Sequence, residues 1–413
     1  MANLMAEYAT IAGADVVSHL RQLAEPLKGA KVVHVNSTRS GGGVAEILHK
    51  LVPLMVELGL DARWEVLTGN DAFFRCTKHL HNGLQGYPVA LEDADRQSFH
   101  AASAENAERL RALLEEADVV FIHDPQPAAL LDLCPNRRGR WIWRCHIDLS
   151  HPHRPIWRFL RPFVAGYDAS VFSLASFAQP LPHPQYLIPP SIDPLSDKNL
   201  ELPEAEIAAA RTRFGIDPER PLITQISRFD RFKDPLGVIA AYRLVKRFLP
   251  NLQLVLAGGS ASDDPEGAAM LQEVRDTAGA DPDIHVLDLP PDSHRCINAL
   301  QRTSRIVLQK SLREGFGLTV TEAMWKQRPV IGGDTGGIRL QVVNYHTGFR
   351  VSTPEGAALR IRYLLHHPEL LEAMGTKAQA YVRENFLLTR QLREYLTLMR
   401  ALDNHGSDRI ELG

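Results

Sequence analysis

The segment SLREGFGLTVTE, residues 311–322, joins two glutamates to a glycine turn. It follows RIVLQKS, which predicts a strand, and it leads into LTVTEAMWKQR, which predicts a helix. Four backbone amides would then stand at the amino terminus of that helix, where about half a positive charge gathers. They belong to Gly315, Phe316, Gly317 and Leu318. Because glycine has no Cβ, a phosphate or a sugar hydroxyl could approach this main chain closely.

The two carboxylates of this segment would serve different parts of such a ligand. Glu314 is expected on the loop at the end of the strand, and Glu322 about one turn into the helix. A carboxylate accepts hydrogen bonds from two hydroxyls at once, and each such bond contributes roughly 1.5 to 3 kcal/mol. This suits a nucleotide sugar, with Glu314 on the hexose and Glu322 on the ribose. The residues alone leave open a plainer alternative, a solvated loop charge and a surface contact early in the helix.

Two cations five positions apart, Arg228 and Lys233, follow another predicted strand in QISRFDRFKDP. Beside a glycine-rich helix start they could neutralise a departing diphosphate. Without further context, a solvated charged loop explains them better, and Arg231 in the same loop has no assigned role.

A third candidate is the run Gly41, Gly42 and Gly43 in NSTRSGGGVAEIL, between a predicted strand and a predicted helix. A plain turn seldom needs so many glycines, which favours a backbone that contacts a ligand phosphate.

Polar clusters close two further strands, His123-Asp124 in one and RCHID, residues 144–148, in the other. Strand ends carry ligands in parallel sheets, so these side chains are candidates for holding an acceptor. A lone histidine at a strand end is more often structural than catalytic, and we interpret His123 in that way.

The elements that must position these residues alternate between strand and helix along the chain. Such alternation predicts an α/β protein with parallel sheets covered by helices on both faces. The alternation pauses at the proline-rich stretch LIPPSIDPLSD, residues 187–197, and then restarts. We therefore expect two doubly wound, Rossmann-like domains facing a cleft, at residues 1–190 and 191–385. A last helix within 386–413 is expected to cross back to the first domain.

Composition narrows the class of protein. The chain has 413 residues, of which 45% are hydrophobic and 23% charged, as in globular proteins. A net charge of -3 predicts neither a nucleic acid nor a membrane as partner. The 4 cysteines show no metal-ligand spacing, so we expect reduced thiols and no metal site. No leader-like or membrane-spanning stretch stands out, so we expect a cytoplasmic protein.

At this point the chain resembles the retaining glycosyltransferases of the GT-B type that carry the E-x7-E motif (family 4), here Glu314 to Glu322. Longer stretches, among them HVNSTRSGGGVAEILHKL, IHDPQP, WRCHIDLS and SRFDRFKDPLGVI, are similar to the glycosyltransferring trehalose synthases within that group.

The resemblance implies roles for individual residues. Arg228 and Lys233 would contact the diphosphate, Glu322 the ribose, and Glu314 with the backbone of 315–318 the donor hexose. Gly42 and Gly43 would lie near the donor phosphate, and His146 would border the anomeric carbon. The acceptor glucose would be held by Asp124, Arg144 and Asp148. Among these, Arg228, Lys233, Glu314 and His146 form the expected catalytic set.

The implied reaction joins a nucleoside diphosphate glucose to free glucose, giving α,α-trehalose and a nucleoside diphosphate, reversibly and with retention. The nucleotide sugar is a substrate, and no cofactor is required. Three alternatives remain: a trehalose phosphorylase, an epimerase of UDP-sugars with the same fold, and a non-catalytic nucleotide-sugar sensor. The sequence leaves open the identity of the nucleotide and the favoured direction of the reaction. It also leaves open the oligomeric state, for which a homodimer is one alternative.

Overall fold

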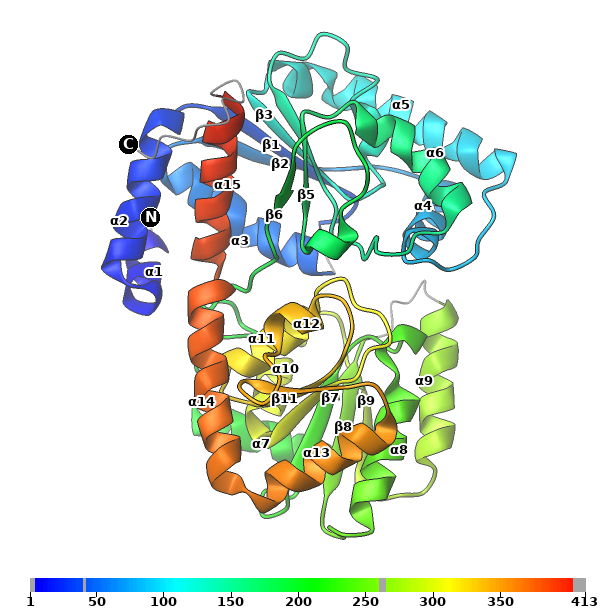
Figure 1. The fold of residues 1–413 in the computed structure, drawn as a ribbon, viewed down its shortest axis with the longest axis vertical. Coiled ribbons are helices and arrows are strands. Elements are labelled where there is room, and N and C mark those ends of the chain that lie inside the picture. Colours follow the sequence, from blue (N-terminus) through cyan, green and yellow to red (C-terminus); the bar gives the residue numbers. More distant parts are fainter. Residues whose placement is uncertain (1–3, 40–41, 260–264, 404–413) are drawn as a thin grey trace. The chain divides into compact units, whose positions relative to one another are not determined.

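The chain divides into two compact units, each built around one parallel sheet (Figure 1). Unit 1 comprises Met1–Pro190 and Leu388–Gly413, and unit 2 comprises Ser191–Leu387. The computed structural model describes residues 4–39, 42–259 and 265–403.

Unit 1 contains a sheet of six parallel strands in the order β2-β1-β3-β4-β5-β6. The strands are β1 (Lys31–Asn36), β2 (Asp61–Val66), β3 (Val119–His123), β4 (Arg140–Arg144), β5 (Ala169–Phe172) and β6 (Gln185–Leu187). The helices are α1 (Leu4–Ala12), α2 (Ala14–Ala24), α3 (Gly43–Glu57), α4 (Asp71–Leu84), α5 (Asp93–Glu116), α6 (Arg154–Ala165) and α15 (Leu388–Asp403). Short 3-10 turns lie at η1 (Glu25–Leu27), η2 (Ala128–Leu130) and η3 (Ala175–Phe177).

Unit 2 repeats this architecture with the strand order β12-β11-β10-β7-β8-β9, again all parallel. The strands are β7 (Leu222–Ile226), β8 (Gln253–Gly258), β9 (Ile284–Asp288), β10 (Ile306–Gln309), β11 (Val330–Gly333) and β12 (Gly348–Val351). The helices are α7 (Glu204–Phe214), α8 (Pro235–Lys246), α9 (Pro265–Ala278), α10 (His294–Thr303), α11 (Leu318–Trp325), α12 (Ile338–Gln341), α13 (Pro354–His366) and α14 (Pro368–Asn385), with a 3-10 turn η4 (Arg231–Lys233). The two doubly wound sheets predicted from the alternation are confirmed.

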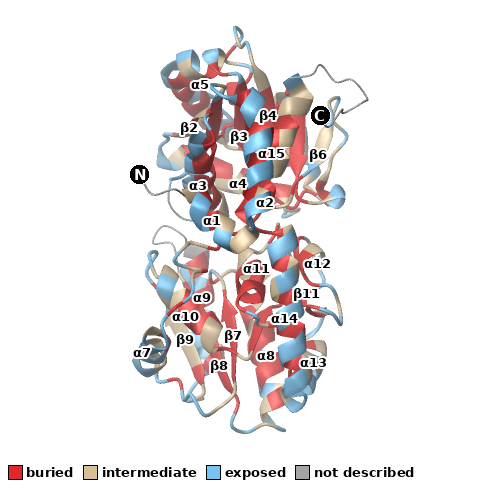
Figure 2. Cartoon of the chain, turned by 90° about the vertical axis from the view of Figure 1, so that its left-hand side faces the viewer, coloured by how far each residue is buried: buried red, intermediate tan, exposed pale blue. Residues whose placement is uncertain are grey.

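The inner strands of both sheets are buried, as parallel strands covered on both faces must be (Figure 2). The edge strands β2, β6 and β9 are partly exposed. In unit 1, alternate residues of β1 and β3, such as Val33 and Ile122, join the apolar core formed with α4, α5 and α6. The residues between them, including Phe121, face the other side. There Tyr395 of α15 stacks on Phe121, with ring centroids 4.8 Å apart.

Helix α15 belongs to unit 1 although the whole of unit 2 precedes it in the chain. It packs beside α2 and α3 (Figure 1). Arg390 anchors its first turn by donating to the carbonyl oxygens of Pro189 and Pro190, each at 2.9 Å. The side chain is 7% exposed, so these charged hydrogen bonds are shielded from water. Among the described residues, no helix is long and apolar enough to cross a bilayer.

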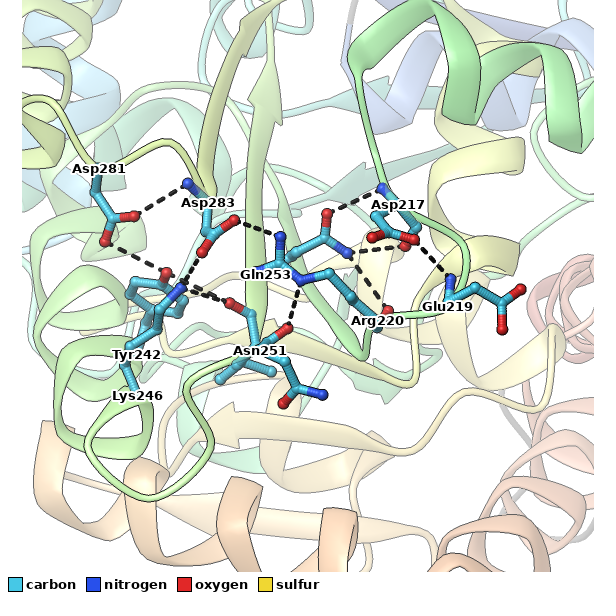
Figure 3. A network of polar contacts seen from close by, with 10 residues as sticks. Asp217, Glu219, Arg220, Tyr242, Lys246, Asn251, Gln253, Asp281 and Asp283 are labelled. Carbon is cyan, nitrogen blue, oxygen red and sulfur yellow. Dashed lines mark hydrogen bonds and ion pairs between the residues drawn. The ribbon is translucent and has the colours of Figure 1, made fainter.

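A polar network ties together the segments that enter β7, β8 and β9 (Figure 3). Asp283, just before β9, accepts from Arg220 Nη1 at 2.7 Å and pairs with Lys246 of α8. Gln253 at the start of β8 accepts from the Asp217 amide at 3.0 Å and donates to its carbonyl at 2.9 Å. The Arg220 and Lys246 cations hold the pKa of Asp283 at about 2, below its usual value. The amino edge of this sheet is therefore fixed by charge as well as by strand pairing.

Candidate functional site

In unit 2, Lys233 and Glu314 form an ion pair at the carboxyl edge of the sheet. Lys233 Nζ lies 2.6 Å from Glu314 Oε2, and the side chains are 17% and 8% exposed. Lys233 follows β7 and Glu314 follows β10, and these two strands are neighbours in the sheet. The plainer reading of Glu314 as a solvated loop charge is therefore wrong.

Three donors converge on the same oxygen of Glu314. Besides Lys233, Ser311 Oγ donates to Oε2 at 3.2 Å and Gln309 Nε2 at 3.5 Å. Within the described ranges, no donor contacts Oε1. One carboxylate oxygen is thus fixed by the protein, which leaves the other as the acceptor for a ligand hydroxyl.

The backbone after Lys233 is held in an unusual conformation. Asp234 has a φ of 52°, in the left-handed region, and its side chain caps α8 by accepting from the Gly237 amide at 3.2 Å. Lys310, which is 4% exposed and follows β10, forms an ion pair with Asp234. Gln225 Nε2 donates to the Lys233 carbonyl at 2.7 Å. These contacts fix where the Lys233 side chain begins.

The glycine turn before α11 lies against a second glycine turn. Gly317 is the N-cap residue of α11 with a φ of 86°, a conformation that favours glycine. A Cβ at Gly336 would lie 1.7 Å from the Glu314 carbonyl oxygen, and a Cβ at Gly337 would lie 2.4 Å from Phe316 Cα. The Phe316 side chain is buried and contacts Phe386, with ring centroids 5.7 Å apart. It follows that this stretch can offer a ligand its main chain rather than the phenyl ring.

Glu322 lies inside α11 and is 1% exposed, so the alternative of a surface contact is wrong. One turn further on, Lys326 Nζ donates to the Glu322 carbonyl at 3.0 Å, to Gln301 Oε1 at 2.8 Å and to Asn199 Oδ1 at 3.1 Å. Burial lowers the pKa of Lys326 to about 7, and the nearby Glu322 carboxylate partly opposes this shift.

Arg228 differs from Lys233 although both belong to the same loop. Its side chain is 65% exposed, and Nη2 lies 3.7 Å from Asp230 Oδ2. The prediction of a solvated charged loop therefore fits Arg228 and the exposed Arg231, but not Lys233.

In unit 1, His146 lies at the end of a row of three imidazoles. His123 Nδ1 is 3.0 Å from His146 Nε2, and His123 Nε2 is 3.0 Å from His34 Nδ1. Burial lowers the pKa of His34 to about 3 and those of His123 and His146 well below their usual value. All of these rings are therefore neutral near neutral pH.

The Asp124 carboxylate holds the main chain of His146 in place. Asp124 Oδ1 accepts from the His146 amide at 2.7 Å, and its own amide donates to the Arg144 carbonyl at 2.9 Å. Its φ of 66° is unusual for a residue other than glycine, and local contacts maintain it. Burial raises the pKa of Asp124 to about 6, although the His146 amide and the Arg144 cation oppose this shift.

Arg144 is fully buried, and it donates from Nη2 to Ser173 Oγ at 3.5 Å. Its Nε and Nη1 are buried without a hydrogen-bond partner among the described residues. Asp148 is 5% exposed and accepts from the Ser150 amide at 2.9 Å. Arg144 thus ends β4, while Asp124 follows β3 and His146 and Asp148 follow β4. Their expected contact with an acceptor stays a prediction.

The remaining glycine run opens α3. Gly42 is its N-cap residue with a φ of 81°, and Gly43 is its first residue. Gly41 lies outside the described residues. None of the four cysteines is paired, and within the described part of the chain no group of three His, Cys, Asp or Glu side chains is arranged to hold a metal ion.

Sequence reasoning missed the residues that support these side chains. His34 lies within the apolar run KVVHVN, and Lys310 directly follows the apolar strand β10. A buried polar residue within an apolar strand is a signal that could have been used, because such a residue needs a partner. The second glycine turn, Gly336-Gly337, was a further available signal.

Comparisons with known proteins agree with this arrangement. A family described as "Trehalose synthase, N-terminal domain" matches residues 34–179, and "Glycosyl transferases group 1" matches residues 206–381. The chain is 47% identical to a trehalose synthase of Pyrococcus horikoshii over 400 residues, which are 96% of each chain. It is 43% identical to a trehalose synthase of Rubrobacter xylanophilus, over 96% of this chain and 97% of that one.

More distant proteins share the fold. A trehalose phosphorylase of Pleurotus pulmonarius is 31% identical over 84% of this chain and 54% of its own length. The structure of the trehalose-6-phosphate synthase OtsA superposes with a TM-score of 0.74 at 14% identity, covering 90% of this chain and 99% of that one. The chain therefore belongs to the trehalose synthase family and is a trehalose-related glycosyltransferase with the GT-B fold.

Proposed function

We propose that this enzyme joins a nucleoside diphosphate glucose to free glucose, forming α,α-trehalose and the nucleoside diphosphate, reversibly and with retention at the anomeric carbon. The observation that carries the proposal is the Lys233–Glu314 pair, 2.6 Å apart, next to the glycine turn that opens α11. A cation, a half-satisfied carboxylate and helix amides suit a ligand that combines phosphates with sugar hydroxyls.

In this proposal unit 2 binds the donor. Lys233 and the exposed Arg228 neutralise the diphosphate as it leaves, together with the amides at the start of α11. Glu314 Oε1 accepts from a hexose hydroxyl while Oε2 stays bound to Lys233, and Glu322 serves the ribose. Fixed charges of this kind are typically worth about 10² to 10³ in rate each, because they need no reorganisation during the reaction.

Unit 1 would bind the acceptor. Arg144 has buried N–H groups left for an acceptor hydroxyl, and Asp124 and Asp148 lie at neighbouring strand ends. His146 borders the reacting carbon, and Gly42 and Gly43 approach the donor phosphate. No side-chain nucleophile is assigned, since the acceptor hydroxyl would enter on the face that the diphosphate leaves and pass its proton to a phosphate oxygen. No cofactor is proposed, and the nucleotide sugar is a substrate.

A phosphorylase is the second candidate, because a trehalose phosphorylase matches over 84% of this chain. It would use inorganic phosphate where the diphosphate is expected. Incubating the enzyme with trehalose plus UDP, ADP or GDP, and separately with trehalose plus phosphate, distinguishes the two. We expect a sugar nucleotide in the first case; glucose 1-phosphate in the second would favour the phosphorylase.

A matrix of nucleoside diphosphate glucoses against glucose and related acceptors tests the forward reaction, with product linkage read by NMR. We expect α,α-trehalose from glucose and one or more of the donors. Maltose supplied alone serves as a control for isomerisation. An altered sugar released from donor alone would indicate an epimerase, and binding without transfer under every condition would indicate a sensor.

A further inference from the structure

Three neighbouring strands of the unit 1 sheet bring three histidines into one row. His34 lies in β1, His123 ends β3, and His146 follows β4. The strand order β1-β3-β4 places these elements side by side. His34 pairs in register with Phe121, and His123 is two residues further on, so the side chains of these three residues share one face.

Aromatic packing fixes the buried end of the row, which is His34. His34 is fully buried, and its ring stacks on Phe121 with centroids 4.7 Å apart and planes within 6°. Tyr395 of α15 covers the same pair. His123 is 2% exposed, whereas His146 is only partly buried. The outer ring is therefore the one that a ligand could reach.

The two hydrogen bonds of the row must run in the same direction. Burial keeps each imidazole neutral, so each ring carries one N–H and one lone pair. If His34 donates from Nδ1, then His123 donates from Nδ1 to His146 Nε2, and His146 carries its hydrogen on Nδ1. If the direction is reversed, His34 must carry its hydrogen on Nε2.

The environment of His34 Nε2 decides between these arrangements. This atom is buried and has no hydrogen-bond partner in the part of the chain that the structure describes. A buried N–H without an acceptor is rarely tolerated in proteins, whereas an unused lone pair is tolerated more often. The arrangement in which every N–H points toward His146 is thus favoured. Because His34 Nε2 has no described hydrogen-bond partner to take or supply a proton, the row cannot conduct protons.

We propose that His34 and His123 are positioning residues that fix His146 as the neutral tautomer with its hydrogen on Nδ1, so that this nitrogen is a hydrogen-bond donor and never a base. What His146 donates to, an oxygen of the sugar or of the phosphate, rests on the proposed function. The tautomer itself does not depend on it.

The tautomer can be read directly by NMR of the full chain labelled with 15N-histidine. The signals of His146 are assigned by their absence in His146→Gln. We expect a protonated Nδ1 and an unprotonated Nε2 in the wild-type protein at neutral pH. A hydrogen on Nε2, or a doubly protonated ring, would overturn the proposal.

Two variants of His123 form a matched pair. His123→Asn keeps an amide N–H near the position of ring Nδ1, whereas His123→Phe keeps a ring without nitrogen. We expect His146 to retain the Nδ1–H form in the Asn variant and to become a mixture in the Phe variant. Unchanged signals in His123→Phe would overturn the proposal. If that variant does not fold, the wild-type spectrum decides.

Kinetics provide a second readout if transfer activity is found. We expect His123→Phe to lower kcat by about 10-fold or more with little change in KM, as loss of one oriented donor should, and His123→Asn to recover most of it. Equal rates in the two variants would remove the positioning role. Absence of transfer in the wild-type protein, with the tautomer as expected, would contradict only the proposed function.

Discussion

Replacing Lys233 by methionine tests the central ion pair of unit 2. Methionine retains most of the length of the side chain and removes the charge together with the N–H donors. Glu314 would then keep Ser311 and Gln309 as donors, at 3.2 and 3.5 Å, and would lose the Lys233 cation, at 2.6 Å. Breaking a fully buried pair costs about 3 to 5 kcal/mol. Because Lys233 is 17% exposed, we expect the free energy of unfolding to fall by about 2 kcal/mol.

A double-mutant cycle isolates this interaction from other effects of the substitution. The variants are Lys233→Met, Glu314→Gln and the combination, each unfolded with urea. We expect a coupling energy of about 1 to 3 kcal/mol, since the two groups are in direct contact. Arg231→Met is the matched control, because it removes a cation from the same turn without breaking a described ion pair. We expect this control to stay within about 0.5 kcal/mol of the wild type.

The same variants test catalysis. If Lys233 stabilises the departing diphosphate, Lys233→Met should lower kcat by about 100-fold, which corresponds to about 2.7 kcal/mol in activation free energy. Arg231→Met should retain the wild-type rate. The reasoning fails if the cycle is additive within about 0.5 kcal/mol, or if both arginine and lysine variants lose activity equally.

Three further predictions concern stability. Asp283→Asn should destabilise unit 2 by about 1 to 2 kcal/mol near neutral pH, because the pKa of Asp283 in the folded protein, about 2, lies below the usual 3.8. This loss of stability should shrink only as the pH falls below about 4. A loss that does not change with pH in urea titrations would contradict this cause. Gly336→Ala should lower the free energy of unfolding by at least about 1 to 3 kcal/mol and abolish most of the activity, because its Cβ would lie 1.7 Å from the Glu314 carbonyl oxygen. The control Gly356→Ala, whose Cβ meets nothing closer than 3.5 Å, should be neutral or stabilising in the same thermal melts. Arg390→Met should lower the free energy of unfolding of unit 1 by about 1.5 to 3 kcal/mol, because it removes the charged hydrogen bonds to the Pro189 and Pro190 carbonyls. If the backbone amides of α15 exchange as slowly as in the wild type, these hydrogen bonds are dispensable.

The sequence predicted the two sheets and their strands apart from the short β6, because strands and helices depend on local periodicity. The roles of the site residues stay predictions. The sequence did not predict which residues meet. Lys233 and Glu314 are 81 positions apart, and they meet only because β7 and β10 are adjacent in the strand order. Strand order depends on tertiary packing, which local patterns do not reveal.

His123 is a second residue whose contacts could not be predicted from local sequence patterns. A lone histidine at a strand end is more often structural, and the local pattern gives no reason to connect His123 with His34. The register of β1 with β3 makes that connection, since it places both rings on one face. The left-handed backbone of Asp234 could not be predicted either, because its environment, including Lys310 from another strand, maintains it.

The polar network at the strand starts of unit 2 (Figure 3) has a practical consequence for protein engineering. Strands β7 and β8 have five and six residues, which separates that edge from the loops at their other ends by about 17 to 20 Å. Changes made at the two edges should therefore combine additively. Acid tolerance could be redesigned around Asp283, or a dye attached there, without altering sugar transfer.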